Sequence, residues 1–171
     1  KVVYIDTEGS FSLDRFTQMG GSESKLKTIL LLDVHDWNEQ HACVISLEKL
    51  CEQDKIGLIV VDSVVALYRV EMDQGQFQRL NKQLATQYAV LSRIARKYKI
   101  PIIVTNQVYE KGEGVELTSR MIARYWSKAL IELKKADRPG HRTALVRKHR
   151  SLSEDRKIDF KIVEKGLEDV V

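Results

Sequence analysis

The sequence predicts an α/β fold in which a mostly parallel sheet carries helices on both faces. Three observations indicate this class: short apolar runs that end in polar residues, helical patterns of ten or more residues between these runs, and shorter β-like runs in the last third of the chain. Parallel strands need long crossover connections, which helices usually supply. The order of the segments therefore predicts β–α–β units followed by an antiparallel extension of the sheet.

The central strand is expected within residues 57–63, which are Gly-Leu-Ile-Val-Val-Asp-Ser. Four consecutive apolar residues are typical of a strand that is buried on both faces of a parallel sheet. Asp62 and Ser63 follow this run, and ligands of open α/β sheets bind at the carboxyl ends of the strands. A carboxylate at that position can hold Mg²⁺ on a bound phosphate, but a strand-end aspartate that only caps a turn has the same pattern.

Two further strands are expected to end in polar residues at the same edge. Residues 1–6 form an apolar run that leads into Thr7 and Glu8, and Gly9 allows a tight turn after them. Residues 102–104 follow Pro101 and lead into Thr-Asn-Gln, which ends at Gln107. Three such strands together are far more specific than one, and they predict that Glu8, Asp62 and Gln107 face a common pocket.

The helices are predicted from caps and from apolar spacing. Ser12 can cap a short helix that ends before Gly20-Gly21, and Asp36 can begin an amphipathic helix that runs to about Gln53. Apolar residues repeat at steps of three and four from Phe77 to Tyr98, which predicts one long helix. Another strand is expected at residues 29–34.

The last third is expected to contain a mobile loop and an antiparallel meander. Residues 108–118 contain two glycines and are interpreted as the loop. Three β-like runs follow at residues 128–133, 143–148 and 158–163, and a turn at residues 138–141 joins the first two. The meander is predicted to extend the parallel sheet.

Composition is that of an ordinary globular protein, with 171 residues, 43% hydrophobic and 30% charged. This length suits one domain, and no apolar run approaches the roughly 18 to 20 residues that cross a bilayer. Two cysteines and four histidines show no metal-ligand spacing, so free thiols in a reducing compartment are expected. The net charge of +4 is concentrated in residues 134–150, which favours either a phosphate-binding surface or a solvated face of two strands.

Residues 4–11, Tyr-Ile-Asp-Thr-Glu-Gly-Ser-Phe, resemble a segment of the RecA-like recombinases of archaea and eukaryotes. Residues 58–63 followed by Ala-Leu-Tyr-Arg at 66–69 are similar to the Walker B strand of that family and the start of its first DNA-binding loop. Residues 103–108, Ile-Val-Thr-Asn-Gln-Val, resemble the strand before its second DNA-binding loop. The resemblance covers essentially the whole chain in order, and it is greatest to the short archaeal paralogues of the family.

The resemblance implies roles for five residues around ATP and Mg²⁺. Glu8 is expected to polarise the water that attacks the γ-phosphate, and Gln107 to sense that phosphate and pass its state to the next loop. Asp62 is expected to hold the Mg²⁺ shell with Ser63 beside it, and Arg15 to stack on adenine. Each of three residues also has a structural alternative. Glu8 can cap the next helix as a turn carboxylate, Gln107 can hydrogen-bond to the loop backbone, and Arg15 can be a surface arginine of a helix.

Five cations are expected to meet phosphates. Lys148 and Arg150 correspond to positions that reach the ATP of a neighbouring subunit in filaments of the family, unless they are basic surface or DNA-contact residues. Arg69, Lys111 and Arg120 lie in or beside the two loops that are expected to contact DNA, through phosphates and without sequence preference.

The chain departs from the family in one motif, because no G-x-x-x-x-G-K-[ST] occurs in it. Residues 1–171 are therefore expected to form a RecA-like ATPase core that is truncated before its first strand and phosphate loop. The expected function is ATP and DNA binding with weak hydrolysis, in support of homologous recombination and DNA repair in the cytoplasm near the nucleoid. The expected partners are DNA and the main recombinase, with a homo-oligomer also possible. The alternatives are a non-catalytic adaptor of that recombinase and a RecA-fold ATPase of another pathway.

Overall fold

The computed structural model describes residues 1–72, 76–111, 114–117, 120–136 and 138–170, which fall into two compact units. One unit contains Lys1–Phe11 and Ser24–Trp126. The other contains Ser12–Glu23 and Ser127–Val171.

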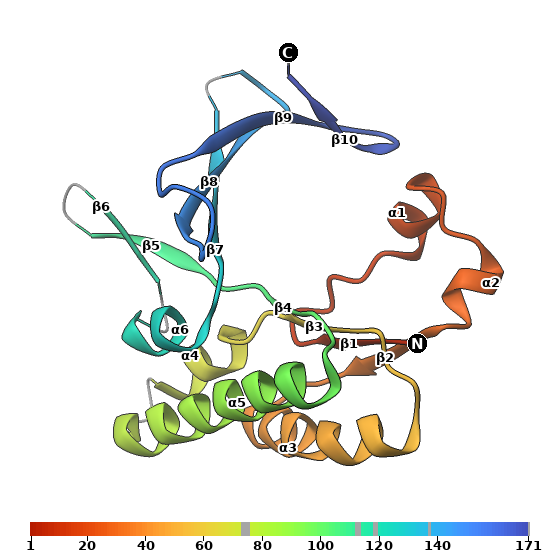
Figure 1. Cartoon of the computed structure of the whole chain (residues 1–171), viewed down its shortest axis with the longest axis vertical. Coiled ribbons are helices and arrows are strands. Elements are labelled where there is room, and N and C mark those ends of the chain that lie inside the picture. Colours follow the sequence, from red (N-terminus) through yellow and green to blue (C-terminus); the bar gives the residue numbers. More distant parts are fainter. Residues whose placement is uncertain (73–75, 112–113, 118–119, 137, 171) are drawn as a thin grey trace. The chain divides into compact units, whose positions relative to one another are not determined.

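The first unit is built on a four-stranded parallel sheet with the strand order β2-β1-β3-β4 (Figure 1). Asp6 is paired with Asp33 on one side and with Asp62 on the other, so the carboxyl ends of the first three strands are level. Val61 is paired with Val104, which places the end of β4 beside that of β3. The strands are β1 (Val2–Asp6), β2 (Ile29–Asp33), β3 (Leu58–Asp62) and β4 (Ile102–Val104).

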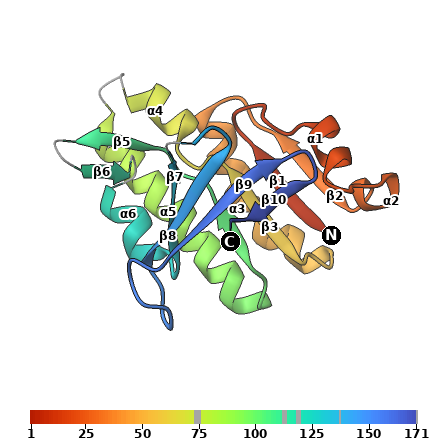
Figure 2. The ribbon, with the colours of Figure 1, turned by 90° about the horizontal axis from the view of Figure 1, so that it is seen from above.

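Helices α3 (Trp37–Gln53) and α5 (Phe77–Tyr98) lie side by side on one face of this sheet (Figures 1 and 2). The side chain of Asp36 accepts a 2.9 Å hydrogen bond from the Glu39 amide and so caps α3, as predicted. The apolar stripe of α5 packs into the core, where its Leu80, Leu84 and Ile94 are fully buried. The two helices therefore cover one face of the sheet, and the carboxyl ends of its strands remain accessible to polar side chains.

Short elements complete the first unit. Helix α4 (Ala66–Met72) follows β3, and α2 (Glu23–Leu26) and α6 (Arg120–Trp126) are the other short helices. Strands β5 (Val108–Lys111) and β6 (Gly114–Leu117) pair as an antiparallel hairpin. The prediction of a loop over residues 108–118 is therefore wrong in the described part of this segment. The segment contains two short β-forming runs, and those runs pair with each other.

Strand β3 was expected to be buried on both of its faces, but only one face is fully buried. Ile59 and Val61 are fully buried against the helices, whereas Leu58 and Val60 point the other way and are half-buried. A continuous apolar run does not show which of its faces neighbouring elements cover, and only packing decides this.

The second unit combines an antiparallel sheet with helix α1 (Leu13–Gln18). The sheet has the order β10-β9-β8-β7, and Figure 2 shows β8, β9 and β10 in blue. Three of the strands match the predicted meander, but β10 was not predicted, and the strands form a separate sheet rather than extending the parallel one. Their bounds are β7 (Leu130–Lys135), β8 (His141–Lys148), β9 (Lys157–Val163) and β10 (Gly166–Asp169).

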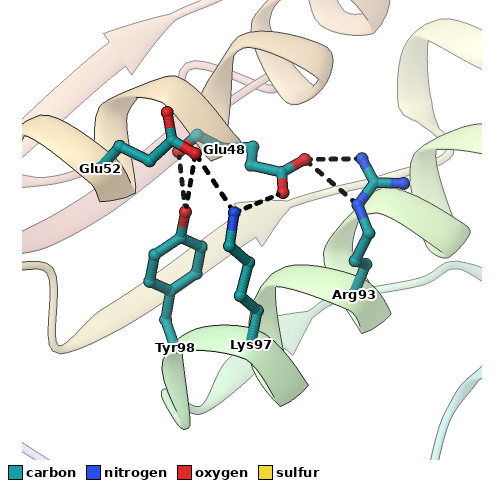
Figure 3. A network of polar contacts seen from close by, with 5 residues as sticks. All are labelled: Glu48, Glu52, Arg93, Lys97 and Tyr98. Carbon is teal, nitrogen blue, oxygen red and sulfur yellow. Dashed lines mark hydrogen bonds and ion pairs between the residues drawn. The ribbon is translucent and has the colours of Figure 1, made fainter.

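A network of exposed charges links α3 and α5 on the outer surface of the first unit (Figure 3). Arg93 and Lys97 of α5 form ion pairs with Glu48 of α3 at 2.7 and 3.1 Å. Hydrogen bonds from Arg93 and then from Lys97 hold the pKa of Glu48 below its usual range. Such exposed pairs contribute little to stability, and the buried apolar layer beneath them is the main contact between the two helices. Within the described part of the chain, no helix is long and apolar enough to cross a membrane.

Candidate functional site

Backbone hydrogen bonds continue past the ends of β1, β3 and β4 and bring the three polar segments side by side. The Thr7 amide donates to the Asp62 carbonyl at 2.9 Å, and the Thr105 amide donates to the Val61 carbonyl at 3.0 Å. The Val64 amide then donates to the Thr105 carbonyl at 3.2 Å. These bonds keep the segments after the strands in register, so their side chains meet at one edge of the sheet.

Glu8 lies at the centre of this edge. Its Oε1 accepts hydrogen bonds from Ser63 Oγ at 2.6 Å and from Gln107 Nε2 at 3.0 Å. The Oε1 atom of Gln107 in turn accepts a hydrogen bond from the guanidinium of Arg69 on α4. A continuous path of contacts therefore links Arg69, through the Gln107 amide, to the Glu8 carboxylate.

The Asp62 carboxylate is held by three hydroxyl groups. Its Oδ2 accepts from Tyr4 at 2.6 Å and from Ser10 at 3.2 Å, and its Oδ1 accepts from Thr105 at 2.5 Å. Burial and then the hydrogen bond to Asp62 raise the pKa of Tyr4 well above the ordinary tyrosine value. Tyr4 therefore remains a protonated donor, and together with Ser10 and Thr105 it orients the Asp62 carboxylate.

Asp6 accepts hydrogen bonds from the backbone, unlike the neighbouring carboxylates, which contact side chains. It is buried, and its oxygens accept hydrogen bonds from the amides of Glu8, Ser10 and Phe11 at 3.2, 3.1 and 2.8 Å. Burial raises the pKa of Asp6, but the amides of Phe11, Ser10 and Glu8 together bring it below the usual range. Asp6 thus shapes the loop that carries Glu8 and Ser10, and Gly9 makes the turn with a φ of 63°.

Thr7 clamps the peptide unit at Ser63. Its Oγ1 donates to the Ser63 carbonyl at 2.7 Å and accepts from the Ser63 amide at 2.9 Å. Both residues are buried, and the peptide bond between Asp62 and Ser63 is cis. The hydroxyl of Ser63 donates to Glu8 and also accepts a bond from the Ala66 amide at 3.2 Å.

The donor set fits a magnesium–nucleotide complex. Mg²⁺ prefers oxygen ligands and usually takes only one or two carboxylates, with phosphates and waters completing the shell. Asp62, the Ser63 hydroxyl and the Thr105 hydroxyl supply such oxygens, and Glu8 supplies an acceptor beside them. In the described residues no three His, Cys, Asp or Glu side chains gather into a metal centre.

The structure thus brings together Glu8, Asp62, Ser63, Gln107 and Arg69 among the predicted site residues. Arg69 lies on helix α4, and its predicted role toward DNA stays a prediction. The side chains of Lys111 and Arg120 lie outside the described part of the chain, although their backbones belong to β5 and α6.

Three predicted cations belong to the second unit. Arg15 on α1 donates to the carbonyls of Glu164 and Val163 at 2.7 and 2.8 Å. These bonds use the edge of the guanidinium, whereas stacking on adenine uses its flat face, so that predicted role stays open. Lys148 ends β8, and Arg150 is exposed just after it. Their roles toward a neighbouring subunit stay predictions.

Tyr4, Ser10 and Thr105 were not predicted as partners of Asp62. The sequence contained a signal for Tyr4. This residue lies two positions before Asp6, so its side chain is on the same face of β1, and Asp6 is paired with Asp62. Nothing in the sequence indicated Gln40, a fully buried glutamine whose Nε2 donates to the Val64 carbonyl at 3.0 Å.

The parallel α/β sheet carries a carboxylate, a hydroxyl and an amide at the carboxyl ends of adjacent strands, which is the arrangement predicted for the RecA-like class. The comparisons with known proteins agree. Residues 1–170 match the model of the family described as Rad51, and the chain belongs to this family. Membership of the Rad51 family gives the chain a role in DNA recombination and repair.

Within this family the chain is similar to proteins named "DNA repair and recombination protein RadB". It is 36% identical to that of Methanobrevibacter smithii, over 98% of this chain and 74% of the relative. It is 39% identical to the protein of that name from Thermococcus onnurineus, over 100% of this chain and 78% of the relative. A structure described as "Crystal structure of the RadB recombinase" superimposes with a TM-score of 0.83 at 35% identity, and the match covers 100% of this chain and 79% of that one. The predicted resemblance to the short archaeal paralogues is confirmed.

Proposed function

We propose that residues 1–171 act as one RecA-like core that binds ATP with Mg²⁺ and DNA, hydrolyses ATP weakly and assists homologous recombination. The observation that carries the proposal is the contact of Glu8 with both Ser63 and Gln107, beside Asp62, at the shared edge of three parallel strands. A buried-strand carboxylate, an adjacent acceptor and an amide within hydrogen-bonding reach are among the groups that phosphoryl transfer to water uses.

The proposed roles follow from what each group can donate or accept. Asp62, with its orientation set by Tyr4 and Thr105, holds the water shell of Mg²⁺. Glu8 orients a water for attack on the γ-phosphate and accepts its proton. Gln107 can donate its amide either to Glu8 or to a phosphate oxygen, which lets it report the state of the nucleotide. Bound ATP and Mg²⁺ supply the transferable phosphoryl group and its charge neutralisation.

Arg69 gives this site a route to DNA. Its guanidinium hydrogen-bonds to Gln107, so a DNA phosphate that competes for Arg69 changes the hydrogen bonding of Gln107 and, through it, of Glu8. Phosphate contacts of this kind are salt-sensitive and independent of base sequence. We propose Lys111 and Arg120 as further contacts to DNA.

Two groups of the second unit complete the proposal. Lys148 and Arg150 are proposed to reach the nucleotide of an adjacent subunit if the protein assembles, because cations there stabilise charge on the γ-phosphate. Arg15 is proposed to place its flat guanidinium face on adenine while its edge remains bound to backbone carbonyls.

Turnover of ATP by the full-length protein, with and without single-stranded DNA, tests the proposal. A Glu8→Gln change is expected to lower kcat by at least about 100-fold while ATP binding persists, since an amide cannot accept the proton of water. Glu52→Gln is the matched control: it alters an exposed carboxylate on α3 and leaves turnover unchanged. Equal turnover of Glu8→Gln and wild type excludes Glu8 from this role.

A non-catalytic adaptor is the second candidate function. The observation that fits it is the contact of Arg69 with Gln107, because this contact can link nucleotide binding to DNA binding without hydrolysis. An adaptor binds the main recombinase and DNA without turnover. Binding of the recombinase with no ATP hydrolysis by the full-length protein favours this function over the first.

A further inference from the structure

Two fully buried glutamines meet between helices α3 and α5. Gln40 Nε2 donates to Gln87 Oε1 at 2.9 Å and to the Val64 carbonyl at 3.0 Å. Gln40 belongs to α3 and Gln87 to α5, and both side chains are 0% exposed. Val64 immediately follows Ser63, so this amide pair reaches the segment that leaves the candidate site.

The Val64 carbonyl sets the direction of both amides. A carbonyl oxygen only accepts, so the nitrogen of Gln40 must face it. The same nitrogen then needs an acceptor on its other side, and the oxygen of Gln87 fills that place. The orientation of Gln87 therefore depends on Gln40, and that of Gln40 depends on the backbone at Val64.

Stability alone does not explain this pair. Gln40 Oε1 and Gln87 Nε2 are buried and have no hydrogen-bond partner among the described protein groups. A buried polar atom without a partner is costly, and an apolar pair of similar shape avoids that cost. The contact that such an apolar pair could not make is the one to the Val64 carbonyl.

The segment from Ser63 to Ala66 is held by hydrogen bonds from three other parts of the first unit. Thr7 of the loop after β1 clamps the Ser63 peptide unit, Thr105 after β4 accepts from the Val64 amide, and Gln40 donates to the Val64 carbonyl. The Ser63 hydroxyl accepts from the Ala66 amide and donates to Glu8. A displacement of Val64 therefore moves the hydroxyl that orients the Glu8 carboxylate.

We propose that Gln40 is a positioning residue for the nucleotide site, and that Gln87 holds its amide in the required orientation. The proposal deepens the proposed ATPase function and rests on it for its kinetic consequence. Its structural part, that Gln40 places the Ser63–Ala66 turn, concerns geometry alone and has its own measurement.

Three methionine variants test the proposal, because methionine keeps the size of glutamine and removes its hydrogen bonds. Gln40→Met removes the donor to Val64, and Gln87→Met removes only the group that orients this donor. Gln83→Met is the matched control, since Gln83 accepts a 2.7 Å bond from the Trp37 indole between the same two helices and does not contact the turn. Each full-length variant is measured for kcat and KM toward ATP and for amide hydrogen exchange at Ser63, Val64 and Ala66.

Gln40→Met is expected to lower kcat about tenfold, the usual order for a lost supporting contact, with KM within about twofold of wild type. Exchange at the three turn amides is expected to rise about tenfold more than exchange in the centre of α5, and Gln87→Met to give a smaller change in both quantities. Gln83→Met is expected to change neither kcat nor exchange at the turn.

A purely structural role predicts that Gln40→Met and Gln83→Met lose stability with no change in kcat or in turn exchange, and this result overturns the proposal. If the wild type shows no ATP turnover, the proposed function fails alone and the exchange measurement still decides the positioning role. If Gln40→Met does not fold, Gln87→Met decides it: kcat and turn exchange equal to those of Gln83→Met refute the proposal.

Discussion

Replacing Thr7 by valine tests whether the site edge is held by one buried hydroxyl. Thr7 Oγ1 makes two hydrogen bonds to the Ser63 peptide unit, at 2.7 and 2.9 Å, and Ser63 is 2% exposed. Valine has nearly the same shape but leaves the Ser63 amide and carbonyl without this partner. Each unsatisfied buried group costs about 1–3 kcal/mol, and the added methyl returns roughly 1 kcal/mol. The expected loss in the free energy of unfolding is therefore about 1–5 kcal/mol.

Urea unfolding followed by circular dichroism measures this loss, with Thr7→Ser as the control. Serine keeps the hydroxyl and removes one methyl, so it is expected to cost only about 1 kcal/mol. The order of stability should be wild type, then Thr7→Ser, then Thr7→Val. If Thr7→Val is as stable as Thr7→Ser or more stable, the two hydrogen bonds do not hold the Ser63 peptide and the argument is refuted.

Three further predictions concern ionisable groups. Burial and the bond to Asp62 raise the pKa of Tyr4, so its contribution to stability is complete below the ordinary tyrosine pKa of about 10 and is lost as the pH rises through the folded-state value. Ultraviolet titration should show a late-ionising tyrosine in the wild type that is missing from Tyr4→Phe. The lowered pKa of Asp6 contributes stability above the ordinary value of about 3.9 that is lost as the pH falls through the folded-state value. Asp6→Asn should therefore cost about 1–3 kcal/mol at neutral pH, and urea unfolding should show a smaller difference near pH 3. Glu48→Gln removes the exposed ion pair with Arg93 and is expected to lower the melting temperature slightly. Salt screens such a pair, so the difference from wild type should vanish near 1 M salt. A difference that persists at this salt concentration contradicts a surface role.

The elements that depend on local signals were predicted well. Ser12 and Asp36 cap the helices that they were expected to begin, and the apolar repeat from Phe77 to Tyr98 forms the single helix α5. The polar residues after β1, β3 and β4 were also predicted to share an edge, because the direction of parallel strands fixes where their ends lie. A cap, a helical period and a strand end are all visible within a few residues of one another.

Elements that depend on distant pairing were predicted less well. The segment from Val108 to Leu117 was expected to be a loop, yet its two halves pair as β5 and β6. The C-terminal strands were expected to extend the parallel sheet and instead form their own sheet. The apolar pattern of a strand shows that it will pair, but its partner depends on competition among all available edges.

The order of residues alone established the α/β class, the family resemblance and the three polar segments that meet at the sheet edge. Tertiary structure decided which partners each of the neighbouring carboxylates has. Asp6 accepts hydrogen bonds from backbone amides, Asp62 accepts them from three hydroxyls, and Glu8 accepts them from Ser63 and Gln107. These carboxylates are chemically alike, and their partners are separated from them by up to 99 positions in the chain. Strand register and side-chain rotamer select those partners, and neither is encoded within the few residues around each acid.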